Sequence, residues 1–253
     1  MVHFVGAGPG AEDLLTIRGA EHLRKADVVI YAGSLVNPAL LGLCKAGTRI
    51  YNSAEMTLEE VLRVMERAEA EQMTTVRLHT GDPSVFGAVR EQMDALQMRG
   101  IAFDVTPGVS SFFGAAAALR AEYTLPGVSQ TVILTRMAGR TPVPEREELS
   151  RLAAHGASMV IFLSAGMAEA VQEALLSGGA YTENTPAAVV YKVTWPEERI
   201  LRCRLGELGK ICRENGISKT SLLLVGDFLG DEYGRSCLYD PTFSTEYRER
   251  KDY

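Results

Sequence analysis

Short β-branched runs alternate with helical periodicity through the first half of the chain. The clearest helix spans residues 57–71, where apolar side chains recur at three- and four-residue spacing and charged side chains take the other face. Thr57 and Glu60 have the spacing of a capping box at its start. Strands are expected at residues 2–5, 27–31, 49–51, 75–79 and 102–106. Strands separated by single helices predict a mainly parallel sheet with helices between its strands.

The second half has a different order of elements. Strands are expected at residues 131–135, 158–163, 187–191, 200–204 and 221–225, and helices at residues 145–154, 166–177 and 206–215. The fourth strand of this series follows the third across residues 195–198, a connection too short for a helix. This spacing predicts an antiparallel hairpin and therefore a mixed sheet.

These two patterns predict two dissimilar α/β domains. No internal sequence repeat relates them. We place the first domain at residues 1–115 and the second at residues 116–230. Residues 231–253 are polar and tyrosine-rich, and we interpret them as a tail that packs only against a partner.

Composition narrows the function without identifying it. The 253 residues carry a net charge of −6, which argues against broad attraction to nucleic acid or anionic lipid. The four cysteines are widely spaced, so no zinc site or redox motif is indicated, and free thiols fit a cytoplasmic protein. No apolar run is long enough to cross a membrane, and the chain begins without a signal-peptide pattern.

The first candidate for chemistry is the glycine-rich segment at residues 6–10, directly after the first strand. Such a loop permits a sharp turn and a close approach of a ligand to the backbone. A dinucleotide-binding loop is disfavoured, because the second strand ends at Tyr31 without a following carboxylate and Pro9 removes a backbone N–H. A plain tight turn remains the alternative. P-loop and nucleophile-elbow motifs are absent from the sequence.

Two further loops follow strands of the same half. Asp82 lies in the segment at residues 79–87, and its carboxylate either points into a ligand crevice or caps the next helix. His79 either takes part in proton transfer or is a buried, hydrogen-bonded residue. In the segment at residues 106–111, Ser110 and Ser111 either cap a helix or bond a ligand. Parallel strands bring their carboxyl ends to one edge, where such sheets bind ligands.

Three basic residues in loops are candidates for holding an anionic substrate. Arg136 and Arg140 flank residues 137–139, and Lys192 follows a strand. A guanidinium group matches a carboxylate through its planar pair of donors. Ordinary solvated loop charge is the alternative.

The three glycine-containing segments, at residues 6–10, 80–87 and 107–110, together resemble the tetrapyrrole methyltransferase family over residues 2–226. Three further segments, at residues 31–36, 130–144 and 190–196, resemble the branch that acts on precorrin-4 or cobalt-precorrin-4. The resemblance implies two α/β domains with S-adenosylmethionine bound between them. It also implies transfer of a methyl group to C-11 of a corrin precursor in cobalamin biosynthesis, with S-adenosylhomocysteine as product.

The resemblance also assigns residues. It places the cofactor beside Pro9, Thr80, Gly81, Asp82, Val85, Ser110, Ser111, Leu163, Tyr191, Lys192 and Val225. We expect Arg136, Arg140 and Lys192 to clamp the carboxylates of the tetrapyrrole, and we name His79 and Asp82 as candidate proton or electrostatic partners in catalysis. We expect no protein-bound metal, no membrane or nucleic-acid partner, and a homodimer.

Other functions remain open at this stage. Methyltransferases of the same fold act on uroporphyrinogen, on diphthine precursors in protein, or on ribosomal RNA. The acidic charge argues against RNA. A non-catalytic tetrapyrrole- or nucleotide-binding module would carry similar loops.

Overall fold

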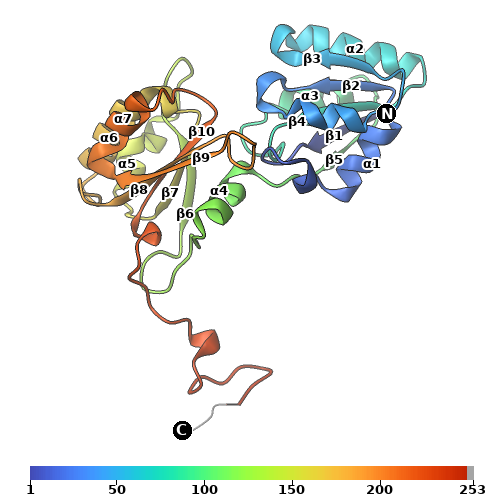
Figure 1. Cartoon of the computed structure of the whole chain (residues 1–253). Helices are drawn as coiled ribbons and strands as arrows, with labels where there is room; N and C mark the ends of the chain where they lie inside the picture. Colours follow the sequence, from blue (N-terminus) through green and yellow to red (C-terminus); the bar gives the residue numbers. More distant parts are fainter. Residues whose placement is uncertain (250–253) are drawn as a thin grey trace. The chain divides into compact units, whose positions relative to one another are not determined.

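The computed structural model describes residues 1–249 and divides into two compact units (Figure 1). Unit 1 consists of Met1–Ala115 together with Lys192–Glu198, and unit 2 begins with Ala116–Tyr191 and resumes at Arg199. The segment Lys192–Glu198 therefore belongs to unit 1 although the strands before and after it belong to unit 2.

Unit 1 is built on a five-stranded, wholly parallel sheet, as the strand–helix alternation predicts. Its strands lie in the order β3-β2-β4-β1-β5. Their bounds are Val2–Gly6 for β1, Val28–Tyr31 for β2, Arg49–Asn52 for β3, Thr75–His79 for β4 and Phe103–Thr106 for β5. The helices are α1 (Ile17–Lys25), α2 (Leu58–Ala70), α3 (Arg90–Met98) and α4 (Ser111–Leu119), which ends beyond the unit boundary at Ala115.

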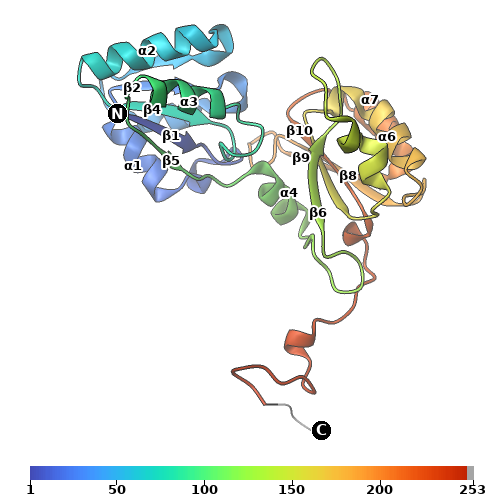
Figure 2. The ribbon, with the colours of Figure 1, turned by 180° about the vertical axis from the view of Figure 1, so that it is seen from behind.

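Helices cover both faces of this sheet, as Figures 1 and 2 show from opposite sides. One core joins Phe4 and Ile30 to Met65 of α2 and Leu96 of α3. The other core lies on the opposite face of the sheet. It contains the neighbouring strand residues Val5 and Val29 and also Leu23 of α1. Because neighbouring residues of a strand point to opposite faces, a strand covered on both sides is buried throughout, and β1 is buried along its whole length.

The helix predicted around residues 57–71 is α2, and its capping box is confirmed. The backbone N–H of Glu60 donates to the Thr57 hydroxyl oxygen at 3.3 Å, and the N–H of Thr57 donates to the Glu60 carboxylate at 2.7 Å. Two amide groups at the helix start are thereby satisfied by side chains.

Unit 2 contains a five-stranded mixed sheet in the order β6-β7-β10-β8-β9. Its strands are β6 (Val132–Arg136), β7 (Ser158–Phe162), β8 (Pro186–Tyr191), β9 (Arg199–Arg204) and β10 (Ser221–Val225). β6 and β7 are parallel, and the other pairs are antiparallel, including the predicted hairpin of β8 and β9. A sheet of this kind directs its strand ends to two opposite edges.

The helices of unit 2 are α5 (Leu149–Ala153), α6 (Ala168–Ser177) and α7 (Leu208–Glu214), and they pack on one face of the sheet around Ile161, Val189 and Leu223. The continuous helix expected over residues 145–154 is wrong. A 3-10 turn at Glu145–Glu147 precedes α5, because Glu148 has extended backbone angles and separates the two pieces. The other two helices of this unit also begin with 3-10 turns, at Ala165–Met167 and Leu205–Glu207.

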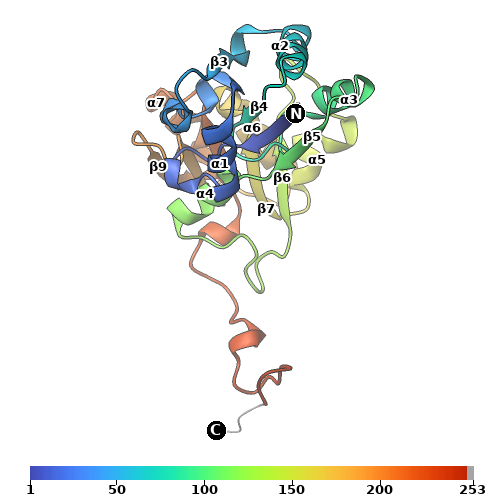
Figure 3. The same cartoon turned by 90° about the vertical axis from the view of Figure 1, so that its right-hand side faces the viewer.

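Beyond β10 the described chain contains 3-10 turns at Asp227–Leu229 and Cys237–Tyr239 (Figure 3). The Arg248 guanidinium donates to the carbonyl oxygens of Leu238, Asp240 and Phe243, which closes this segment on itself. Of the expected tail, residues 250–253 lie outside the described residues. Within residues 1–249, no helix has both the length and the apolar character needed to cross a membrane.

Candidate active site

Three loops meet at the carboxyl edge of the unit 1 sheet. Strand β1 lies between β4 and β5, so the loops that follow these three strands are neighbours. The N–H of Gly8 donates to the carbonyl oxygen of Gly81 at 3.2 Å, and the N–H of Gly81 donates back to Gly8 at 2.9 Å. The chain leaves β1 toward α1 on one face and leaves β4 toward α3 on the other. Open α/β sheets bind ligands at such a divergence of strand ends.

Glycines are required where the loops touch. A Cβ atom on Gly108 would lie 2.2 Å from the carbonyl oxygen of Gly81 and 2.7 Å from the Cα of Gly6. One on Gly6 would lie 2.6 Å from the Gly108 Cα. Because these neighbours are backbone atoms, they cannot move aside as a side chain would. We call the contact of Gly6, Gly81 and Gly108 the glycine junction.

Asp82 ties two of these loops together. Its Oδ2 atom accepts the backbone N–H of Gly108 at 2.8 Å, and Oδ1 accepts the N–H of Ser84 at 2.8 Å and the Ser84 hydroxyl. Burial opposes ionisation, but the hydrogen bonds from Ser84 and Gly108 outweigh it and lower the pKa of Asp82. The carboxylate is therefore ionised at neutral pH. The alternative in which it caps the next helix does not hold, because α3 begins only at Arg90.

His79 is buried at the end of β4 and is 3% exposed. Burial, reinforced by the nearby Arg77 charge, lowers its pKa to about 3, and its Nε2 atom has no hydrogen-bond partner within the described part of the chain. A neutral, enclosed imidazole is poorly placed to exchange protons with a substrate. Its catalytic assignment stays a prediction, which the burial weakens.

The remaining predicted cofactor residues of this unit lie on the same edge. Pro9 belongs to the first loop, and Thr80 and Val85 to the second. Ser110 is buried, and its carbonyl oxygen accepts the N–H of Phe113 in the first turn of α4, which begins at Ser111. The structure thus brings seven of the predicted residues to one sheet edge: Pro9, Thr80, Gly81, Asp82, Val85, Ser110 and Ser111.

Sequence reasoning missed a contribution from Trp195. Its indole N–H donates to the carbonyl oxygen of Pro9 at 3.1 Å. A Cβ atom on Gly10 would lie 2.1 Å from the indole ring, so glycine is needed there for contact with the ring. Thr194 adds a second tie, because its hydroxyl oxygen accepts the N–H of Ala11 at 2.9 Å. No periodicity links positions 186 residues apart, and only the resemblance of residues 190–196 to the family drew attention to this segment.

Lys192 lies in the same returning segment. Its ammonium group is 5.2 Å from the centre of the Trp195 ring and 3.5 Å from the carboxylate of Glu197. Both Lys192 and Thr194 have left-handed backbone angles, with φ of 45° and 65°. Non-glycine residues adopt such angles at some energetic cost, and functional sites are one place where they cluster.

The three cofactor residues predicted in unit 2 do not lie together. Leu163, directly after β7, is 63% exposed and has a φ of 54°. Tyr191 ends β8, and the Arg199 guanidinium stacks on its ring at 4.8 Å. Val225, however, ends the antiparallel strand β10, where it pairs with Met159 and Ala187 near the starts of β7 and β8. Its side chain is fully buried in the core. The opposite strand direction therefore separates Val225 from Leu163 and Tyr191.

The two arginines expected to clamp a substrate have different environments. Arg136 ends β6 and donates to the carbonyl oxygens of Met137, Thr141 at 3.1 Å and Pro142 at 2.6 Å, so its guanidinium braces its own loop. Arg140, within that loop, is exposed. Arg140 is therefore the better placed of the two to meet a carboxylate from solvent.

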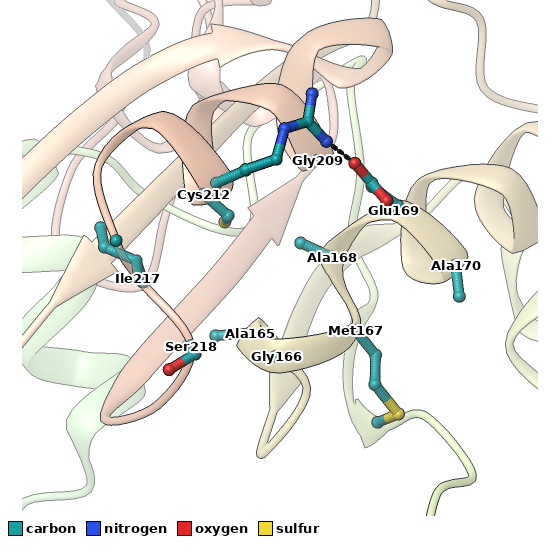
Figure 4. Close-up of a pocket in the computed structure, with 12 residues that line it drawn as sticks. Ala165, Gly166, Met167, Ala168, Glu169, Ala170, Gly209, Cys212, Ile217 and Ser218 are labelled. Atoms are coloured by element: carbon teal, nitrogen blue, oxygen red, sulfur yellow. Dashed lines mark ion pairs between the residues drawn. The ribbon is translucent and has the colours of Figure 1, made fainter.

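A cavity of about 590 Å³ lies in unit 2 between the start of α6 and the residues of α7 and the turn that follows it (Figure 4). Gly166, Gly209 and Ser218 form part of its wall, and the Glu169–Arg213 ion pair lies across it. Its described lining includes none of the predicted site residues. It approaches the arginine loop only through Met167, whose Cε atom would lie 3.2 Å from a Cβ on Gly139.

Comparison with known proteins identifies the relatives of this chain. The sequence pattern of the tetrapyrrole (corrin/porphyrin) methylases matches residues 1–209. A cobalt-precorrin-4 C(11)-methyltransferase of Methanocaldococcus jannaschii is 50% identical, over 98% of this chain and 96% of the relative. A precorrin-4 C(11)-methyltransferase of a Sinorhizobium species is 43% identical, over 98% of each chain.

Solved structures agree with this relationship. The X-ray structure of a cobalt precorrin-4 methyltransferase of cobalamin biosynthesis has a TM-score of 0.88 and 44% identity, covering 91% of this chain and 96% of its own. A uroporphyrin-III C-methyltransferase of Thermus thermophilus, solved with S-adenosylhomocysteine, has a TM-score of 0.73 and 26% identity, covering 90% and 92%. The predicted arrangement of one parallel and one mixed α/β unit is confirmed by these matches.

Proposed function

The chain belongs to the tetrapyrrole (corrin/porphyrin) methylase family, and from this premise we propose that it methylates C-11 of a precorrin-4-type corrin ring. It is an S-adenosylmethionine-dependent methyltransferase. The relatives named for the C-11 reaction are more similar in sequence to this chain than the uroporphyrin-III enzyme is. That order favours a corrin precursor in cobalamin biosynthesis over uroporphyrinogen.

The observation that carries the proposal is the glycine junction with Asp82 beside it. S-adenosylmethionine combines a sulfonium cation with an amino-acid group and an adenosine, all rich in polar atoms. Glycine-rich loops that turn tightly and let a ligand approach the backbone, together with an ionised Asp82 carboxylate and the Ser110 hydroxyl, fit such a ligand. We assign the cofactor contacts to Pro9, Thr80, Gly81, Asp82, Val85, Ser110 and Ser111, with Leu163, Tyr191 and Lys192 as further contacts.

When bound, S-adenosylmethionine supplies a methyl group already activated by its positive sulfur. The nucleophilic ring carbon forms the new C–C bond while the S–CH3 bond breaks, and the electron pair of that bond returns to sulfur. The chain's residues need only hold the two reactants in line and exclude water, a contribution that can reach about 7–11 kcal/mol of the barrier. The reaction itself requires no protein-bound metal, and an enclosed neutral His79 is compatible with it.

We assign the exposed Arg140, together with Lys192, to the carboxylates of the tetrapyrrole, and Arg136 to support of the Arg140 loop. A planar guanidinium pairs with a carboxylate through two parallel hydrogen bonds. This division explains how an acidic chain could hold a polyanionic substrate through a few local cations.

The deciding experiment is product analysis. The purified chain is incubated with S-adenosylmethionine carrying a ¹³C-methyl group and with either metal-free precorrin-4 or cobalt-precorrin-4. The expected product has one added methyl, placed at C-11 by NMR, with an equal amount of S-adenosylhomocysteine released. Because relatives are named for both substrates, comparison of the two turnover rates identifies the one used.

Other outcomes would point to the alternatives. Methylation of uroporphyrinogen, of a diphthine precursor or of ribosomal RNA, with the corrin untouched, would overturn the substrate assignment while leaving the enzyme class. Binding of tetrapyrrole without release of S-adenosylhomocysteine would indicate a binding module instead.

We also propose that the chain acts as a homodimer in the cytoplasm. The dimer is supported by the resemblance to the family, and light scattering during gel filtration measures it directly. The location is supported by four free cysteines, the usual state in a reducing compartment.

A further inference from the structure

We propose that His3, His22 and Asp104 form a binding site for one divalent cation of the zinc class, within unit 1 and apart from the cofactor loops. Two imidazoles and one carboxylate are a common donor set for zinc and for neighbouring transition metals. The proposal goes beyond methyl transfer, which does not need this ion.

Three different elements bring these side chains together. His3 of β1 and Asp104 of β5 are direct partners in the parallel register, so both point to the same face of the sheet. The His3 Nδ1 atom lies 2.8 Å from Asp104 Oδ1. His22 comes from α1, which packs on that face, and its ring stacks on the His3 ring at 3.9 Å between centres.

The spacing is close to that of a bound metal. One donor atom from each residue lies within 4.8 Å of the others. Donors at about 2.1 Å from a tetrahedral zinc ion are roughly 3.4 Å apart, so the side chains must rotate to bring all three donors to one ion. His3 is only 9% exposed, and the paired strands hold its backbone and that of Asp104. Most of the site is therefore formed before an ion arrives.

The charges around these three side chains determine how strongly they would bind a cation. Asp104 of β5 attracts a cation, whereas Arg18 and Lys25 of α1 lie near enough to His22 to oppose one. Because these charges oppose one another, we expect the site to bind a cation with moderate affinity.

The position suggests what the ion would do. β5 is an edge strand held only by β1, and the loop after it carries Gly108 of the glycine junction. A metal joining β5 and β1 to α1 would brace two of the three strands whose ends form the cofactor edge. This proposal departs from the sequence-based expectation of no protein-bound metal, because residues at positions 3, 22 and 104 have no recognisable ligand spacing along the chain.

Calorimetric titration with ZnCl2 tests the site in the full chain. The protein carries no polyhistidine tag, is first dialysed against EDTA, and has its thiols blocked with iodoacetamide so that cysteines cannot bind. We expect one zinc per chain and a rise in the unfolding temperature on binding. His22→Ala and Asp104→Asn should each weaken binding at least about tenfold. Cobalt(II) should give visible absorption bands that disappear in His22→Ala.

His155→Ala is the matched control, because this histidine is exposed and lies in unit 2. It should bind zinc as the unchanged chain does. Absence of binding, or equal binding by the unchanged chain and the His22 and Asp104 variants, would overturn the proposal. Both results are independent of methyl transfer, so the proposed function stands or fails separately.

Discussion

The two sheets of this molecule use their strand ends in opposite ways. In unit 1, all five strands are parallel, so the loops after β1, β4 and β5 share one edge and touch through main-chain atoms at the glycine junction. In unit 2, the ends of β6, β7 and β8 point one way and those of β9 and β10 the other. Its candidate residues are consequently divided, and the ones near solvent, Leu163 and Arg140, offer side chains.

This difference in strand direction distinguishes two kinds of binding site. A site made of main-chain atoms tolerates little change in backbone position and, apart from its glycines, makes few demands on side-chain identity. Such a site suits a cofactor common to a whole family. A site made of exposed side chains can change by substitution while the fold stays the same, and it suits substrate selection. Substitutions in the two regions should therefore affect cofactor binding and substrate binding differently.

The largest effect should come from Gly108→Ala. The added methyl would meet the Gly81 carbonyl and the Gly6 backbone, so the three loops must separate. We expect S-adenosylhomocysteine binding to fall below detection by calorimetry, with a loss of about 2–3 kcal/mol in the free energy of unfolding.

Gly42→Ala is the control for this change. A Cβ atom there would meet nothing within 4 Å, and its unfolding free energy should change by less than about 0.5 kcal/mol. If Gly108→Ala binds the cofactor normally, the main-chain site has been assigned to the wrong place.

The second prediction concerns acid stability of unit 1. The pKa of His79 is lowered in the folded state to about 3, whereas the unfolded chain takes up this proton near pH 6.5. The stabilisation from a neutral His79 is therefore complete above pH 6.5 and is lost progressively between pH 6.5 and pH 3, by up to about 1.4 kcal/mol per pH unit. Urea titrations at several pH values measure the slope.

In His79→Phe this slope should be smaller, because the phenyl ring keeps the apolar volume beside Phe4 without a titrating group. His155→Phe, at an exposed position, should leave it unchanged. Activity that depends on His79 protonation near neutral pH would contradict the low pKa and restore His79 as a proton carrier.

Trp195→Phe should have an intermediate effect. The substitution keeps an aromatic ring over Gly10 but removes the N–H that donates to Pro9. Loss of one such hydrogen bond corresponds to about 1 kcal/mol, or roughly a fivefold weaker affinity for S-adenosylhomocysteine. Because Trp195 is the only tryptophan in the chain, its fluorescence in the unchanged protein should also respond to cofactor binding. If the Trp195 fluorescence does not change when the cofactor binds, the Pro9 loop does not contact the cofactor.

The smallest effect on cofactor affinity is expected from substitutions in unit 2. Arg140→Ala should weaken tetrapyrrole binding about tenfold and leave S-adenosylhomocysteine affinity unchanged, since the side chain is exposed. Arg136→Ala should instead loosen its loop and lower the unfolding temperature as well. If Arg140→Ala weakens the affinity for the tetrapyrrole and for S-adenosylhomocysteine equally, the proposed division between the two regions is wrong.

Local patterns allowed much of the fold to be predicted. Strand alternation located the parallel sheet, the short gap at residues 195–198 located the hairpin, and Thr57 with Glu60 located the start of α2. Each of these signals lies within a few residues of the element that it predicts. The helix over residues 145–154 failed because apolar spacing does not reveal the extended backbone at Glu148.

The site was less predictable because its contacts span the chain. The glycine-rich segments could be recognised, but not that Asp82 would bond Gly108 rather than cap α3. The position of Val225 depends on strand direction, which a single apolar run does not encode. Trp195 reaches Pro9 only through the return of residues 192–198 to unit 1, a path fixed by tertiary packing alone.

That return has a consequence for biosynthesis. The parallel sheet is complete in sequence once residue 106 has been made, yet the Pro9 loop lacks its indole and hydroxyl partners until residue 195 leaves the ribosome. A nascent chain therefore contains every strand of the unit 1 sheet early. It cannot complete the contacts of the Pro9 loop at the carboxyl edge of that sheet until most of unit 2 has been made. The order of translation thereby completes the proposed cofactor edge only after residue 195 has been made.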